Sequence, residues 1–101
     1  MAGLCAEYCA GLPARLRELD ELWAADERNP LPPLALRRAL HSIAGSAQTF
    51  GLAPLTAAAR AAEQMLDPCC EAGMPLPPAS REDFAQLMQA VKSAANQAPP
   101  A

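Results

Sequence analysis

The chain has 101 residues, of which 51% are hydrophobic but only 4% aromatic, and its formal net charge is −3. This length suits one domain with a single core, and the acidic balance leaves no basic footprint for binding nucleic acid. No apolar run approaches the ~18 residues that span a bilayer, and the first residues lack the charged and apolar regions of a secretory signal. We therefore expect a cytoplasmic location, with no membrane or nucleic-acid partner.

Helical structure is predicted throughout, because alanine supplies much of the hydrophobic content and β-branched residues are scarce. A first helix is expected over about residues 3–25, with an inner face of Tyr8, Cys9, Leu12, Leu16, Leu19 and Trp23. Trp23 continues the leucine stripe and is expected to anchor the core or its rim. Pro13 predicts either a kink or a break at Gly11-Leu12, after which a second helical piece begins.

Residues 26–33 are polar and punctuated by proline, which indicates a connector and not a site. Pro32-Pro33 can set the first turn of a second helix, expected to end near Phe50-Gly51, where glycine can adopt the left-handed conformation that closes a helix. The apolar positions of this helix form one narrow stripe: Leu36, Leu40, Ile43, Ala47 and Phe50. Pro54 restarts the chain after a short link, which makes the second and third helices antiparallel neighbours.

The third helix is expected over about residues 54–70, and its inward stripe comprises Leu55, Ala58, Ala59, Ala62, Met65, Leu66 and Cys69. Residues 71–79 have the glycine and proline content of a loop. Ser80 followed by Asp83 resembles a capping box at the start of a fourth helix. The core stripe of that helix comprises Phe84, Leu87, Met88, Val91 and either Ala94 or Ala95.

These elements predict an all-α fold, a four-helix up-down antiparallel bundle that forms a single domain over residues 1–101, with about 96–101 as a frayed tail or linker. The first and third helices of such a bundle run parallel. The four cysteines then fall as two pairs at opposite ends, Cys5 with Cys9 and Cys69 with Cys70. A single four-cysteine metal site is therefore not expected, and the cysteines are interpreted as small buried hydrophobes and partly exposed thiols.

His41 is the only histidine, and it lies off the apolar stripe of its helix, on the side of Arg37, Ala44, Gly45 and Gln48. Its imidazole is therefore expected to face solvent, where it could act as a base, a ligand or a nucleophile near neutral pH. A metal site lacks a second histidine or a Cys-x-x-Cys pair, and a hydrolase lacks a Gly-x-Ser-x-Gly turn. A phosphoryl acceptor needs only an exposed ring, a fixed tautomer and free access to the attacking nitrogen.

Gly45 provides that access, because a side chain one turn along the same face would crowd an incoming phosphoryl group or partner. A glycine inside a helix costs about 1 kcal/mol relative to alanine, so its presence needs such a reason. Glu63, at the edge of the third helix's inward stripe, could accept a hydrogen bond from the His41 Nδ1 proton and leave Nε2 free to attack phosphorus. The alternative interpretation of Glu63 is an ordinary surface glutamate.

The run His41-Ser-Ile-Ala-Gly-Ser-Ala-Gln-Thr-Phe-Gly51 resembles the His-x-Leu-Lys-Gly-Ser-x-x-x-Leu-Gly signature of histidine-containing phosphotransfer (HPt) domains. Glu7–Leu16 resembles the first-helix pattern of that family and Leu55–Glu63 resembles its third, so the resemblance covers most of the chain, to about Asp67. It implies that His41 accepts a phosphoryl group from a receiver aspartyl phosphate and passes it to another receiver in two-component signalling. It also implies that Glu63 orients the imidazole.

The resemblance implies response-regulator receiver domains as partners, with a hybrid sensor kinase as a further candidate, and a monomeric chain. The receiver would supply Mg²⁺, whereas the chain itself is expected to hold no metal and no cofactor. Because no kinase machinery is visible, the chain is interpreted as a phosphoryl carrier rather than an autonomous enzyme.

The chain departs from the signature at Ala44, where the family commonly has lysine. Arg37 and Arg38 are candidates to replace that charge, and Arg60 could approach from the third helix. Gln48 is a candidate phosphoryl or partner contact, and Ala44, Gly45 and Ala47 are expected to keep the docking surface small and flat. The alternative is a non-catalytic helical adaptor that binds receivers but has lost phosphotransfer.

Overall fold

Four helices account for nearly all of the computed structural model, which describes residues 2–97, with side chains described from residue 6 onward. They are α1 (Ala2–Arg28), α2 (Leu34–Thr49), α3 (Ala53–Glu71) and α4 (Pro78–Asn96). The described part of the chain contains no strand, which confirms the predicted all-α fold. The tail was predicted over about 96–101, but Asn96 is the last residue of α4. Residues 98–101 and the side chain of Cys5 lie outside the described residues.

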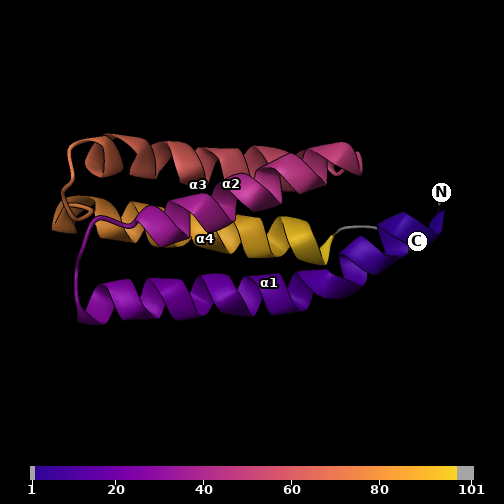
Figure 1. Ribbon diagram of the computed structural model, residues 1–101, viewed down its shortest axis with the longest axis horizontal. Coiled ribbons are helices and arrows are strands. Elements are labelled where there is room, and N and C mark those ends of the chain that lie inside the picture. Colours follow the sequence, from indigo (N-terminus) through magenta and orange to yellow (C-terminus); the bar gives the residue numbers. More distant parts are fainter. Residues whose placement is uncertain (1, 98–101) are drawn as a thin grey trace.

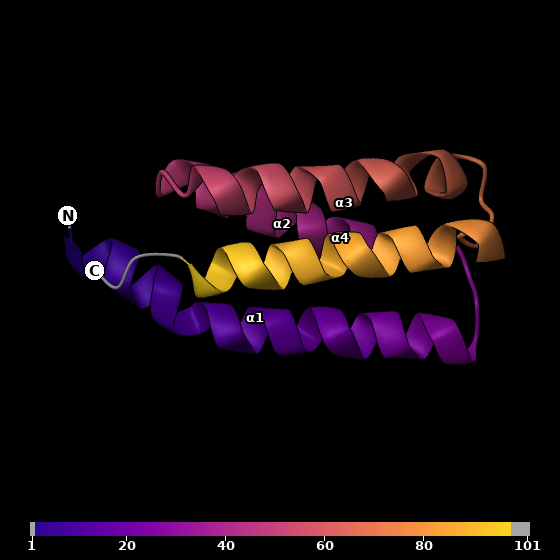
Figure 2. The same cartoon turned by 180° about the vertical axis from the view of Figure 1, so that it is seen from behind.

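The helices form an up-down bundle with extents of 42 × 21 × 19 Å. Figures 1 and 2 show each helix running opposite to the one before it, so that α1 and α3 point the same way. Helix α2 packs against α3 and α1, and α4 packs against the same two helices from the other side. The four-helix antiparallel architecture is therefore confirmed.

Helix α1 is continuous through Pro13, so of the two alternatives the break at Gly11-Leu12 is wrong. Figure 1 shows the helix bending in its N-terminal part. Proline inside a helix removes one backbone hydrogen bond and crowds the preceding turn, which is the usual cause of such a bend. The helix also ends later than predicted, at Arg28.

Asp26 corrects the prediction that residues 26–33 are only a connector, because it lies within α1 and is buried. Its Oδ2 accepts a hydrogen bond from Nη2 of Arg81 on α4, at 3.1 Å. The guanidinium of Arg81 also lies over the Trp23 ring, 4.6 Å from the centroid. This cluster ties the end of α1 to the start of α4, and a partner 55 residues away gives no local sequence signal.

Two glycines close helices in the same way. Gly51 (φ 73°) follows α2 and Gly73 (φ 67°) follows α3. After α2, the Leu52 amide donates to the Ala47 carbonyl and the Gly51 amide to the Gln48 carbonyl, at 2.9 and 3.1 Å. This is the Schellman pattern, which requires a left-handed residue that glycine adopts without strain. The tight turn makes α2 and α3 antiparallel neighbours, as predicted.

The capping box predicted at Ser80 and Asp83 is wrong. Helix α4 begins at Pro78, with Pro77 at the N-cap and no side-chain cap. Proline suits the first helical position because its fixed φ is already helical and its missing N–H would have no partner there. Ser80 and Asp83 consequently lie inside the helix rather than at its start.

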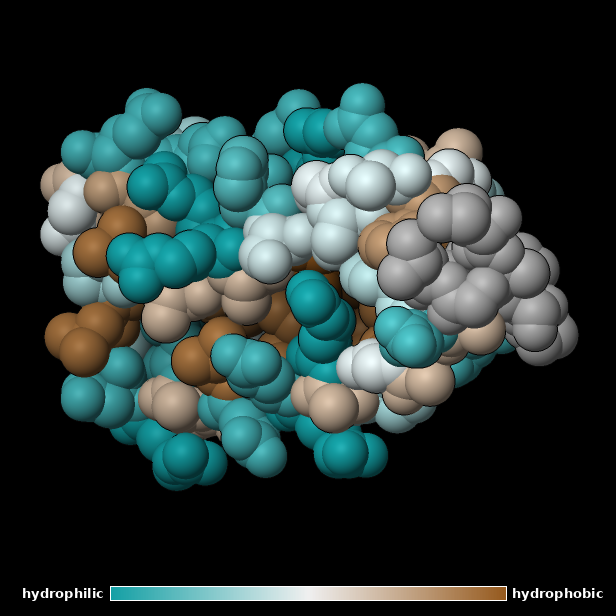
Figure 3. Space-filling model, turned by 45° about the vertical axis from the view of Figure 1, so that its right-hand side comes forward, coloured by the Kyte–Doolittle hydropathy of each residue, from teal (hydrophilic) through white to brown (hydrophobic). Residues whose placement is uncertain are grey.

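The core is aliphatic and runs through all four helices. Its largest fully buried side chains are Leu19, Leu40, Leu55, Leu66, Phe84 and Val91. Two aromatic contacts join residues of the core to partly buried rings at its edge: Phe84 to Trp23 and Tyr8 to Phe50, each with centroids 4.8 Å apart. The face shown in Figure 3 is largely hydrophilic with small hydrophobic patches, as expected for a bundle that buries one stripe of each helix.

The thiols of Cys69 and Cys70 are buried at the C-terminal end of α3. Burial, reinforced by the neighbouring Cys69, raises the pKa of the Cys70 thiol above its ordinary value. Cys9 lies in the N-terminal half of α1, and Figure 1 shows that half of α1 at the opposite end of the bundle from the C-terminal end of α3. Within the described residues, no three His, Cys, Asp or Glu side chains are grouped so that they could hold a metal ion.

Candidate functional site

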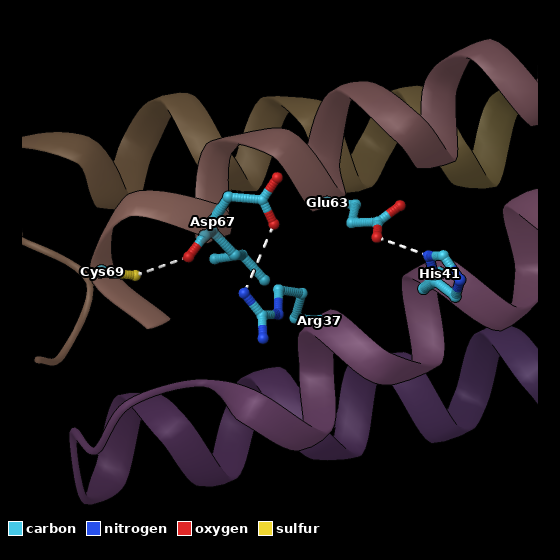
Figure 4. Close-up of polar contacts among 6 residues, drawn as sticks. Arg37, His41, Glu63, Asp67 and Cys69 are labelled. Carbon is cyan, nitrogen blue, oxygen red and sulfur yellow. Dashed lines mark hydrogen bonds and ion pairs between the residues drawn. The ribbon is translucent and has the colours of Figure 1, made fainter. Parts of the chain in front are cut away.

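His41 lies on the outer surface of α2 with its side chain 72% exposed. Its Nδ1 lies 2.7 Å from Oε2 of Glu63 on α3 (Figure 4). The apolar stripe of α2 turns Leu40 and Ile43 into the core, which leaves position 41 facing outward beside α3. The buried alanines Ala59 and Ala62 place the α3 backbone close to α2, and Glu63 then reaches across.

The contact with Glu63 favours one tautomer of the neutral imidazole. An ionised carboxylate can only accept hydrogen bonds, so the neutral ring must carry its proton on Nδ1. The lone pair is then on Nε2, on the exposed side of the ring. The Glu63 side chain is only 17% exposed, so most of it is packed against its neighbours while its carboxylate contacts the ring.

The contact between His41 and Glu63 is one of three polar contacts that cross from α2 to α3. Nη1 of Arg37 lies 3.6 Å from Oδ1 of Asp67, and Nη2 of Arg60 donates to Oε1 of Gln48. The helices are antiparallel, so the residue number rises along α2 as it falls along α3. We call these three contacts the α2–α3 polar seam.

The prediction that Ala44 and Ala47 lie on the docking surface is wrong. Both are buried, with 1% and 0% of their surface exposed, whereas Gly45 is exposed. Helix α2 packs on α3 as well as on α1, so its buried arc is wider than the single stripe predicted from its leucines. Of the three small residues, only Gly45 belongs to the surface around His41.

Gly45 has no packing reason within the chain to be glycine. A Cβ atom built on it would meet no heavy atom within 4 Å, apart from its chain neighbours and the backbone of its own helix. Its φ is not positive, so its conformation suits any residue. The open space above Gly45 leaves room for the clearance predicted from the sequence, although Gly11 on α1 has equally open surroundings.

A hollow of about 420 Å³ adjoins the imidazole, and its walls include Leu34, Arg37, Arg38, Glu63 and Asp67. Both arginines predicted to replace the missing charge thus share a hollow with His41. Figure 4 shows Arg37 turned toward Asp67 rather than toward the imidazole. Arg38 is exposed and also lines a second groove with Arg15 and Glu18 of α1.

Sequence reasoning missed the contact that holds α2 against α1. Ser46 Oγ donates to Tyr8 Oη at 2.8 Å. The same Ser46 Oγ lies 2.9 Å from the Ser42 carbonyl oxygen. Tyr8 is buried and stacks on Phe50. The only sequence signal was a serine next to Gly45 in the motif, and nothing in the spacing pointed to a tyrosine 38 residues earlier.

The fold and the site together define a class: a four-helix bundle that presents one exposed histidine, with its ring held by a carboxylate from the adjacent helix. Comparison with protein-family models places the chain more closely, because the Hpt domain model matches residues 3–94. The chain belongs to the Hpt domain family, whose domains carry out phosphotransfer with receiver domains in two-component phosphorelays. Comparisons with curated proteins and with solved structures gave no significant match.

None of the described helices is long and apolar enough to cross a membrane.

Proposed function

We propose that His41 is the phosphoacceptor of this domain and that it relays a phosphoryl group between receiver domains. The observation that carries the proposal is the exposed imidazole with Nδ1 bound to Glu63. This geometry fixes the tautomer, points the free lone pair outward and leaves Gly45 open beside it. A histidine held in this way has the features that nucleophilic attack requires.

In the proposed step, the Nε2 lone pair of neutral His41 attacks the phosphorus of a receiver aspartyl phosphate. The P–N bond forms while the P–O bond to the aspartate breaks, and that electron pair leaves on the aspartate carboxylate. The ring keeps its Nδ1 proton and becomes positively charged. No proton is transferred in this step. The reverse step passes the phosphoryl group to an aspartate of another receiver.

Glu63 supports this step by accepting the Nδ1 hydrogen bond throughout. The bond gains strength as the ring becomes positive, because a bond between two charged groups is stronger than one involving a neutral imidazole. A carboxylate shielded from water stabilises that charge more than an exposed one does. We propose this orienting and stabilising role for Glu63.

The divalent metal of the reaction belongs, in this proposal, to the receiver. The receiver would contribute Mg²⁺ and the acceptor or donor aspartate, while this chain contributes a positioned nucleophile. The chain is therefore proposed to be a phosphoryl carrier that acts only with a partner.

Label transfer tests the proposal. The chain is mixed with a receiver domain phosphorylated at its aspartate with radiolabelled phosphate, and His41→Gln serves as the control. We expect acid-labile, alkali-stable label on the natural chain and none on His41→Gln. Equal label on both chains would contradict the proposal. Receiver binding without any label would instead support the adaptor.

A further inference from the structure

Four positions of α2, residues 37, 41, 44 and 48, lie on one line along the helix, because they are spaced by four, three and four residues. Three of them take part in the α2–α3 polar seam, with Asp67, Glu63 and Arg60 as their partners. The fourth is the buried Ala44, which brings no polar group to the surface. Position 44 lies between His41 and Gln48, so the α3 residues facing it are Glu63 and Arg60.

The two arginines of the seam differ in the charge of their partners. Arg37 faces the carboxylate of Asp67 at 3.6 Å, so that the pair is close to neutral. Arg60 instead donates to the side-chain amide of Gln48, which carries no charge. Arg60 is exposed, and its positive charge is not offset by the residue that holds it.

Arg60 comes from the same helix as Glu63 and lies one turn before it. Arg38 shares the hollow beside His41 but also lines a groove with Arg15 and Glu18 of α1, so part of its surroundings lies on the side of α2 away from the seam. The anchoring of Arg60 by Gln48 also reduces the freedom that an arginine must lose when it binds an anion.

We propose that Arg60, positioned by Gln48, contacts the phosphoryl group carried by His41, an inference that rests on the proposed function. A phosphoryl group on histidine brings up to about two negative charges beside the seam. A guanidinium presents donors in a planar fork that matches phosphoryl oxygens. Arg60 forms and breaks no covalent bond, and it stabilises the group during and after transfer.

The test compares Arg60→Gln, which removes the charge, with Arg60→Lys, which keeps it. Arg17→Gln is the matched control, because Arg17 is exposed and lines a groove between α1 and α4 instead of the seam. Each chain is phosphorylated both by a phosphorylated receiver and by the small donor phosphoramidate, which needs no protein docking. The readouts are the maximal transfer rate and the ³¹P chemical shift of the phosphohistidine.

With Arg60→Gln we expect the maximal rate from both donors to fall about tenfold, the scale of one lost charged hydrogen bond. The ³¹P resonance should also shift relative to that of the natural chain. Arg60→Lys should recover part of the rate, and Arg17→Gln should match the natural chain.

Two results would overturn the inference while leaving the proposed function intact: unchanged rates and ³¹P shift in Arg60→Gln, or a rate loss seen only with the receiver donor. The second result would make Arg60 a docking residue. Failure of the proposed function is distinguishable, because the natural chain itself would then take no label on His41. Circular dichroism of each variant checks that the bundle is folded.

Discussion

Oε2 of Glu63 and Nδ1 of His41 lie 2.7 Å apart, with the carboxylate largely shielded and the imidazole largely exposed. The contact therefore leaves one ring nitrogen committed and the other open to a partner. The function proposed for the chain depends on this asymmetry, because both the tautomer and the direction of attack follow from it.

Replacing Glu63 should slow transfer without unfolding the bundle. Glu63→Ala removes both the acceptor and the charge, so we expect a fall of about 10- to 100-fold, the range for a charged hydrogen bond. Glu63→Gln keeps an acceptor oxygen and should lose less. The measurement is the rate of label transfer from a phosphorylated receiver. Glu71→Ala, the same substitution at an exposed residue that ends α3, is the control. An unaffected rate in Glu63→Ala would leave Glu63 a surface residue.

Replacing Gly45 should separate stability from function. Because a Cβ meets open space there, Gly45→Ala should stabilise the helix by about 1 kcal/mol and raise Tm by roughly 4–8 °C. Transfer from a receiver should nevertheless fall, since the added methyl group occupies the clearance beside His41. Thermal unfolding and transfer rate are measured together. Gly11→Ala, in similarly open space on α1, should raise Tm and leave transfer unchanged; a normal rate in Gly45→Ala would refute the clearance.

The contact between Asp26 and Arg81 should matter for stability alone. Asp26→Asn leaves Arg81 without its charged partner in a largely buried place, and we expect a loss of about 2–3 kcal/mol in the free energy of unfolding. Asp20→Asn provides the comparison, because its pair with Lys92 is much more exposed and should cost under about 1 kcal/mol. Urea unfolding measures both values, and equal losses would contradict the buried pair's larger role.

From the raised pKa of Cys70 we predict that the free energy of unfolding declines at alkaline pH. Burial raises the pKa of Cys70 in the folded chain above its ordinary value of 9.0, so the folded state holds this proton more tightly than the unfolded state does. The resulting stabilisation is complete below about pH 9 and is lost as the pH rises through the folded pKa. Unfolding by urea at several pH values should show a steeper alkaline decline for the natural chain than for Cys70→Ala. Parallel curves would contradict the assignment to Cys70.

Much of the fold could be predicted from local patterns. The spacing of apolar residues placed all four helices, and glycine at residue 51 marked the turn after α2, because helix periodicity and left-handed glycine are properties of short segments. The same periodicity placed His41 outward and Glu63 at the edge of its stripe, which is where the structure has them. The chemical roles of both residues remain predictions.

The errors share a physical cause, because each depended on a neighbour that was distant in sequence or on competition between two local signals. Asp26 was predicted to lie in a polar connector, because nothing near it in the sequence indicates that Arg81 lies beside it. Ala44 was expected at the surface, since the second buried side of α2 exists only once α3 packs there. At the start of α4, the fixed φ of Pro78 favours a helix that begins at that residue, so Ser80 lies inside the helix and not at its N-cap.

All residues of the polar seam lie on the hairpin formed by α2 and α3, and the turn closed by Gly51 sets the relative register of these helices. A slide of one helix along the other would therefore separate every pair at once. Among the residues whose side chains are described, α1 and α4 contribute apolar backing and the contact of Tyr8 with Ser46, but no charged partner of the seam. The charged and polar groups of the site thus come from a single helical hairpin, so we expect substitutions on the solvent-facing sides of α1 and α4 to leave its chemistry unchanged.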